Sequence, residues 1–187
     1  MALLDQEITY YDGSTSTNDG PLPEGKYYAH IIEVTKKFTD KVVNSRNDKG
    51  MTHICDLLEV TYKIAEGDYE NRRVWSNAIW IFKDPKDDMH TPNPGGNQRY
   101  SVFLDRVNYP CKEVEVKDSN GKKKTVKELP IDVDNDHILG KPVLIEVKHR
   151  KYTNKDGEEK VAANEAGIHI WEEGSSVDVN GGDDLPF

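Results

Sequence analysis

The 187-residue chain has few cysteines, no long apolar run and no excess of positive charge. Only Cys55 and Cys111 are present, without a CxxC pair, which argues against a disulfide scaffold and a cysteine zinc site. No window approaches eighteen consecutive apolar residues, so no transmembrane helix is expected. The N-terminus lacks a basic region followed by a long apolar stretch, so it is not a secretory signal. These absences predict a polar protein of the cytoplasm with no membrane partner.

The motifs of the common enzyme classes are also missing. There is no GxxxxGK[ST], GxGxxG or GxSxG sequence, and the six histidines form no HxH or HExxH pair. Asp132, Asp134 and Asp136 imitate the start of a calcium loop, but His137 replaces its glycine and Val143 its bidentate glutamate. We therefore predict no enzyme, no cofactor and no metal. A metal-dependent nuclease using the three aspartates stays an alternative.

The formal charge of −9 is unevenly distributed along the chain. Residues 172–187 hold five acidic residues and no basic one, so the rest of the chain carries only −4. A negative average argues against a nucleic-acid partner, but it does not describe any single surface.

Hydrophobic periodicity predicts a mainly β protein. In the first strand the apolar face is expected to hold Tyr28, Ile32 and Val34, and in the second the even positions from Ile54 to Ile64 apart from Asp56. A helix ended by Pro110 and a hairpin around Asn120-Gly121 follow the third strand. The expected strands are 26–38, 51–64, 69–82, 141–152 and 161–171, with the helix at 98–108 and the hairpin at 114–126. Three strands, a helix and two strands are the order of a five-stranded antiparallel OB-fold barrel.

Composition divides the chain into three parts. Residues 1–24 form a flexible lead-in, because 12–24 are rich in small polar residues and proline. Residues 25–171 form the barrel. Residues 172–187 form an acidic tail that cannot bury enough apolar surface to fold and is expected to be disordered. The tail nevertheless ends on apolar residues, a pattern that the basic-rimmed pocket of a partner can capture. The predicted partner-binding residues are Asp183, Asp184, Leu185, Pro186 and Phe187.

Aromatic and basic residues share several strands, the combination that binds single-stranded nucleic acid. Cations follow the phosphates, and flat rings stack on unpaired bases without reading their identity. Strand alternation predicts Trp75 and Tyr152 as exposed stacking residues and Trp80 and Phe82 as core. The opposite interpretation, that the rings fill the barrel, carries equal weight. The predicted DNA-binding residues are Lys36, Lys37, Phe38, Arg72, Arg73, Trp75, Asn77, Lys148, Arg150 and Tyr152.

Two resemblances support this interpretation. The acidic, glycine-containing tail ending in DDLPF is similar to the C-terminal peptide of bacterial single-stranded-DNA-binding proteins, which recruits replication and repair enzymes. The body resembles a phage-encoded family of single-stranded-DNA-binding OB-fold proteins. The matching segments are PEGKY at 23–27, LEV at 58–60, EGDYENRRV at 66–74, LGKP at 139–142 and NEAGI at 164–168. The insert at 112–127 and the long connection at 84–97 depart from the family pattern.

The resemblance implies a protein that coats single-stranded DNA in an infected bacterial host during replication, recombination or repair. Its tail would recruit a polymerase, helicase or nuclease and compete with DNA for the basic surface. The alternative is an interaction module, such as a recombination mediator or host-factor inhibitor, that binds no DNA itself. Lys122, Lys123 and Lys124 are expected either to contact phosphate or to be only solvated, and a homo-oligomer is an open alternative.

Overall fold

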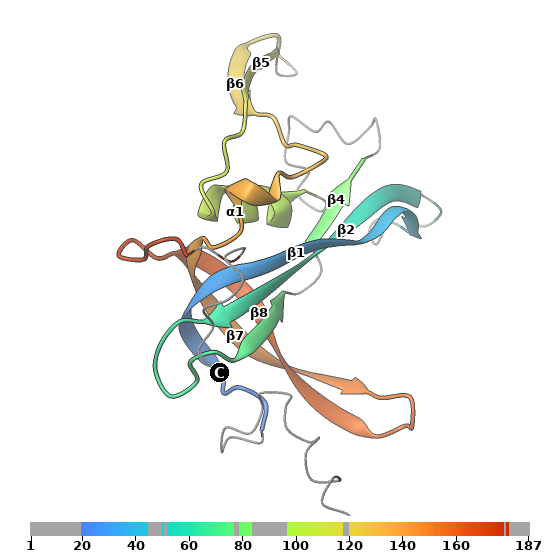
Figure 1. Ribbon diagram of the computed structural model, residues 1–187. Helices are drawn as coiled ribbons and strands as arrows, with labels where there is room; N and C mark the ends of the chain where they lie inside the picture. The colour runs from blue at the N-terminus through green and yellow to red at the C-terminus, as the bar shows by residue number, and fades with distance from the viewer. Residues whose placement is uncertain are drawn as a thin grey trace, which may run out of the picture.

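The computed structural model describes residues 20–44, 50, 52–76, 79–83, 97–117, 120–177 and 179. Most of these residues form β-strands wound into a barrel, with one α-helix beside it (Figure 1). The strands are β1 (Gly25–Asn44), β2 (Thr52–Ile64), β3 (Arg73–Ser76), β4 (Ile79–Phe82), β5 (Glu113–Lys117), β6 (Lys123–Lys127), β7 (Pro142–Thr153) and β8 (Glu159–Ile170). The helix is α1 (Gln98–Arg106).

The barrel closes through five strands in the order β1-β7-β8-β3-β2, because β2 also pairs with β1. All of these pairings are antiparallel except that of β3 with β8, which is parallel. β4 extends the sheet along the outer part of β2. The mainly β class and the closed five-stranded barrel with one helix are therefore confirmed, and the strand order is consistent with an OB-like barrel.

The core fills the barrel with aliphatic residues and a few rings. β2 contributes Leu58, Val60, Tyr62 and Ile64, four of the even positions that its alternation predicts. Ile54, which the same alternation places on this face, is instead exposed in the outer part of β2. α1 adds Tyr100, Phe103, Leu104 and, just beyond its end, Val107, which are all buried as its helical spacing predicts. An ion pair of 2.7 Å between Arg99 and the buried Glu165 fixes α1 to β8. Burial raises the pKa of the Glu165 carboxyl, although Arg99 opposes that shift.

The structure corrects the expected face of β1. Ala29 and Ile31 are buried, whereas Tyr28 is exposed and Ile32 only half-buried. A register shift between Ile31 and Glu33 then returns Val34 to the core. Such a bulge reverses the side to which the following residues point, and periodicity in the sequence does not reveal it.

The expected third strand is divided into β3 and β4, which changes the positions of its rings. Ile79 and Ile81 enter the core, while Trp80 and Phe82 are half-buried and stand outside the core cluster. The prediction that Trp80 and Phe82 are core residues is therefore wrong. The buried Asn97 side chain accepts a hydrogen bond from the Phe82 N–H at 2.9 Å and so occupies part of the free edge of β4.

Residues 171–177 follow β8, contact β1 and the segment before β7, and are here called the C-terminal strap. The Trp171 ring packs on Tyr28, with ring centroids 4.8 Å apart. The Val177 N–H donates to the carbonyl of Gly140 at 2.9 Å, and Gly140 has a φ of 73° that favours glycine. The predicted tail thus begins with residues that contact the barrel, and Asp183–Phe187 lie outside the described residues.

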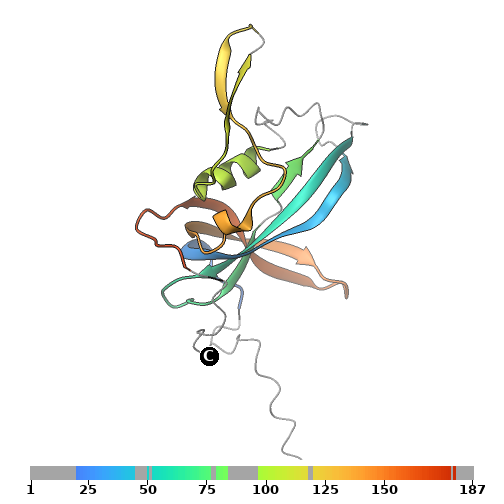
Figure 2. The same cartoon turned by 45° about the horizontal axis from the view of Figure 1, so that its top comes forward.

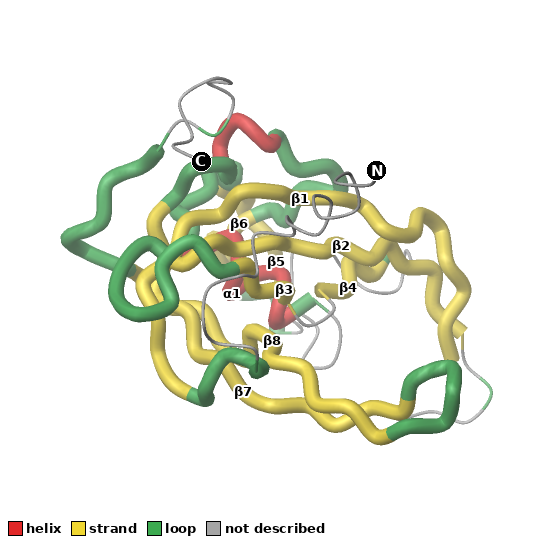
Figure 3. Tube along the Cα trace, turned by 60° about the horizontal axis from the view of Figure 1, so that its bottom comes forward, coloured by secondary structure: helices red, strands yellow, loops and turns green. Residues whose placement is uncertain are grey.

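Two hairpin arms extend beyond the closed part of the barrel. The outer halves of β1 and β2 form one arm, and the outer halves of β7 and β8 form the other (Figure 3). A third hairpin, β5–β6, is a separate two-stranded sheet beyond α1, as the Asn120-Gly121 turn predicts (Figure 2). None of the helices in the described part of the chain is long and apolar enough to cross a membrane.

Candidate nucleic-acid interface

One side of β2 faces away from the core and carries Leu57, Glu59, Thr61 and Lys63. The residues that pair with these positions point to the same side, because directly opposed residues in a ladder share a face. Trp75 on β3 lies opposite Thr61, and Trp80 on β4 lies opposite Leu57. We call this surface the Trp75–Trp80 face.

The face continues across the barrel onto the β7–β8 arm. Trp75 pairs with Asn164 on β8, and Asn164 pairs with Lys148 on β7. Two and four residues further along β7, Arg150 and Tyr152 point to the same side by alternation. Trp75 is 49% exposed and Tyr152 is 46% exposed, in agreement with the prediction that both rings are accessible.

On the other arm, Phe38 of β1 lies opposite Leu57, which therefore sits between Phe38 and Trp80. The Lys41 ammonium lies 4.2 Å from the centre of the Phe38 ring. Leu57 and Thr61 are nearly covered although they point away from the core. Leu57 and Thr61 are four positions apart on β2, a separation of about 13 Å, so the two tryptophans are separate platforms along one surface.

Positive charge exceeds negative charge on this face. Lys63, Arg73 and Arg150 form no ion pair with any residue that the structure describes. The acidic residues of the face are partly neutralised: Lys37 binds Glu59 at 2.7 Å, and Lys148 binds Glu146 at 3.2 Å. Glu33, which lies opposite Thr61, forms no ion pair with the described residues and accepts a hydrogen bond from the Thr61 hydroxyl. The surface therefore combines exposed rings with unpaired cations despite the net charge of −9.

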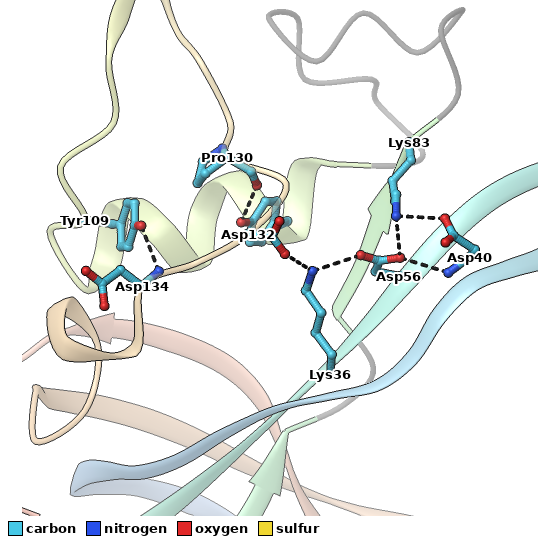
Figure 4. Close-up of polar contacts among 9 residues, drawn as sticks. Lys36, Asp40, Asp56, Lys83, Tyr109, Pro130, Asp132 and Asp134 are labelled. Carbon is cyan, nitrogen blue, oxygen red and sulfur yellow. Dashed lines mark hydrogen bonds and ion pairs between the residues drawn. The ribbon is translucent and has the colours of Figure 1, made fainter.

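Lys36, one of the predicted DNA contacts, lies on the opposite side of the sheet. It pairs with the core residue Leu58, and its ammonium binds the buried Asp56 at 3.1 Å and also Asp132 (Figure 4). The bulge at Lys37 separates the sides to which Lys36 and Phe38 point. Lys36 thus joins the β1–β2 arm to the loop that follows β6.

The remaining predicted residues are placed as follows. The Arg72 guanidinium donates to the carbonyl of Gly20 at 2.7 Å and lies over the Tyr69 ring, so it is engaged at the β2–β3 turn. Arg73 shares the Trp75–Trp80 face because it pairs with Lys63. Asn77 lies outside the described residues.

Sequence reasoning missed Trp80. Trp75 and Trp80 are five residues apart, an odd spacing that puts them on opposite faces of any continuous strand. The division between β3 and β4 brings both to one face. The only signal in the sequence is the pair Ile79 and Ile81, two β-branched residues that flank Trp80 and fill the core.

The aspartates of the alternative metal site are used in local structure. Asp132 binds Lys36, and Asp134 accepts a hydrogen bond from the Asp136 N–H at 3.0 Å, which caps the 3-10 helix Asn135–His137. Within the described ranges, no three His, Cys, Asp or Glu side chains are grouped to hold a metal ion.

Comparisons with family models, curated proteins and solved structures give no significant match for this chain. Function is therefore inferred from the geometry and chemistry of the Trp75–Trp80 face.

Proposed function

We propose that the protein binds single-stranded DNA on the Trp75–Trp80 face, without strong sequence preference and without a chemical step. The observation that carries the proposal is the placement of Trp75, Trp80, Phe38 and Tyr152 on one face together with unpaired cations. Rings stack on any base, and lysine and arginine follow the phosphates. In an OB-fold this side of the second and third strands, between the two loop-bearing arms, is where oligonucleotides bind.

The sequence resemblance adds the biological setting to this proposal. The protein would coat single-stranded DNA during phage replication, recombination or repair. Residues 183–187 would recruit a replication or recombination enzyme, because two acidic residues followed by apolar residues fit an apolar pocket with basic residues around its rim.

The first test is titration of a labelled oligo-dT of about thirty nucleotides at two salt concentrations, with duplex DNA as the control. We expect the single strand to bind much more tightly than the duplex, and its affinity to fall with salt because bound cations release counterions. Replacing both Lys148 and Arg150 with alanine should reduce the slope of log affinity against log salt by about 1 to 2.

The tryptophans separate stacking from simple charge attraction. Stacking contributes about 1–3 kcal/mol per base, so Trp75→Ala and Trp80→Ala should each weaken binding by about tenfold or more. Trp171→Phe is the matched control, because this third tryptophan lies in the strap, where its ring packs on Tyr28 of β1. Bound oligonucleotide should quench the fluorescence of Trp75 and Trp80 and leave that of Trp171 unchanged. Wild-type protein that binds no oligonucleotide, or alanine variants that bind as well as wild type, would refute the proposal and favour the interaction module.

A further inference from the structure

The β5–β6 hairpin and its base, residues 112–127, form a lysine-rich segment that is here called the lysine hairpin. It contains six lysines and three acidic residues. Lys123 binds Glu115 at 2.8 Å, and Lys127 binds Asp105 at 3.3 Å. Lys117 and Lys124 are exposed and form no ion pair with the described residues. The positive charge of the hairpin is therefore only partly balanced by its own chain.

The hairpin also carries an apolar face with no partner in the core. Val114 lies opposite Val126, and Val116 lies opposite Lys124, so the three valines and Lys124 share one side of the two-stranded sheet. All three are half-buried, and none belongs to the core cluster. An isolated two-stranded hairpin is marginally stable in water, so a surface that covers these valines would stabilise it.

A segment of opposite charge lies in the β2–β3 loop, residues 65–71, here called the acidic loop. Glu66, Asp68 and Glu70 are exposed, and the loop contains no basic residue. None of the three carboxylates has an ion pair or side-chain hydrogen bond with the described part of the chain. The net charge of the acidic loop is −3 and that of the lysine hairpin is +3.

The two segments lie at opposite ends of the molecule in both views of the ribbon (Figures 1 and 2). Within one chain they do not meet. We propose that the lysine hairpin of one copy binds the acidic loop of the next copy, with the side that carries Lys124 and the three valines in the contact. Because the contact joins two different surfaces, it is head-to-tail and can repeat along a row of copies.

A second copy explains the hairpin better than DNA does. A phosphate backbone accounts for the lysines but offers no surface for three valines, whereas protein interfaces have an apolar centre and a polar rim. The hairpin also lies beyond α1, and neither segment contributes a residue to the Trp75–Trp80 face. The contact leaves that face free in every copy. Its consequence, cooperative coating of a single strand, rests on the proposed function, whereas the contact itself does not.

Two charge-reversal variants test the contact without DNA. The hairpin variant carries Lys117→Glu, Lys122→Glu and Lys124→Glu, and the loop variant carries Glu66→Lys, Asp68→Lys and Glu70→Lys. Each variant alone has two segments of like charge and should lose association, by about tenfold or more for three exposed pairs. An equal mixture restores opposite charges at every contact, so it should associate as wild type does. Sedimentation velocity at low and high salt measures this, and far-UV circular dichroism confirms folding.

The outcomes separate the contact from the proposed function. Wild-type protein that stays monomeric at low salt, or a mixture that sediments as monomers, overturns the contact. Reduced affinity of the hairpin variant for an oligo-dT long enough to bind only one copy shows that the hairpin contacts DNA. This result also overturns the contact between copies. Restored association in the mixture supports the contact even if wild type binds no DNA, and in that case only the proposed function fails. Loss of cooperativity on long oligo-dT in both variants, with unchanged affinity for the short one, supports both.

Discussion

Asp56 provides the sharpest test of how the β1–β2 arm is held in place. Its side chain is fully buried, and it binds Lys83 at 3.0 Å and Lys36 at 3.1 Å (Figure 4). It also accepts a hydrogen bond of 3.0 Å from the backbone N–H of Asp40, a residue with a φ of 52° at an irregular point of β1. The substitution Asp56→Asn keeps the size of the side chain and removes its charge.

The size of the effect follows from these contacts. Removing one partner of a buried ion pair typically costs about 3–5 kcal/mol. Here both lysines keep a second acidic partner, Lys36 with Asp132 and Lys83 with Asp40, so the loss should be smaller. We expect the free energy of unfolding to fall by about 2–3 kcal/mol rather than about 3–5 kcal/mol, because each lysine still has one carboxylate to pair with after the substitution. For a chain of this length the melting temperature should fall by about 5–10 °C.

The pH dependence gives an independent check. Burial alone would raise the pKa of Asp56, but the Asp40 N–H and the two lysines outweigh it and hold the pKa below its ordinary value of 3.8. The stability from the charged carboxylate is therefore fully present above pH 3.8 and is lost as the pH falls through the lowered value. The difference between wild type and Asp56→Asn should be largest near neutral pH and should shrink in acid.

Thermal unfolding followed by circular dichroism, from neutral to acidic pH, measures both effects. The matched control is Asp132→Asn, the same chemical change at a carboxylate that shares Lys36 but has a side chain 81% exposed. An exposed pair contributes about 0–1 kcal/mol, so the control should be close to wild type. Equal melting temperatures for the two variants, or a difference that grows in acid, would refute the argument from burial.

Two further predictions concern other parts of the fold. The raised pKa of Glu165 means that its contribution to stability falls as the pH rises above the ordinary value of 4.5, so Glu165→Gln should flatten this part of the curve of unfolding free energy against pH. A Cβ at Gly140 would collide with the Val177 carbonyl, so Gly140→Ala should release the strap and speed its cleavage by a glutamate-specific protease. Gly157→Ala is the control, since its φ of 82° is strained but nothing lies near its Cβ, and strap cleavage should stay slow.

Local sequence determined most of the elements of this protein and their order, apart from the division of the third strand into β3 and β4. Period-two patterns specify the long strands. The spacing of Tyr100, Phe103, Leu104 and Val107 specifies the helix, because residues three or four positions apart lie on the same side of an α-helix. The Asn120-Gly121 pair specifies a hairpin turn, since glycine adopts the φ of 76° found there. These signals arise between residues a few positions apart, so they can be predicted without the fold.

The tertiary structure alone decided which side of the sheet each functional residue occupies. The irregularity at Ile32 places Lys36 on the side of the buried Asp56, and the bulge at Lys37 places Phe38 on the other side. The division between β3 and β4 brings Trp80 to the same face as Trp75. The physical reason is that alternation has a period of two, so one extra or unpaired residue moves every later side chain to the other face. Such irregularities are fixed by barrel closure and by contacts such as that of Asp56 with the Asp40 N–H, which join residues distant in sequence.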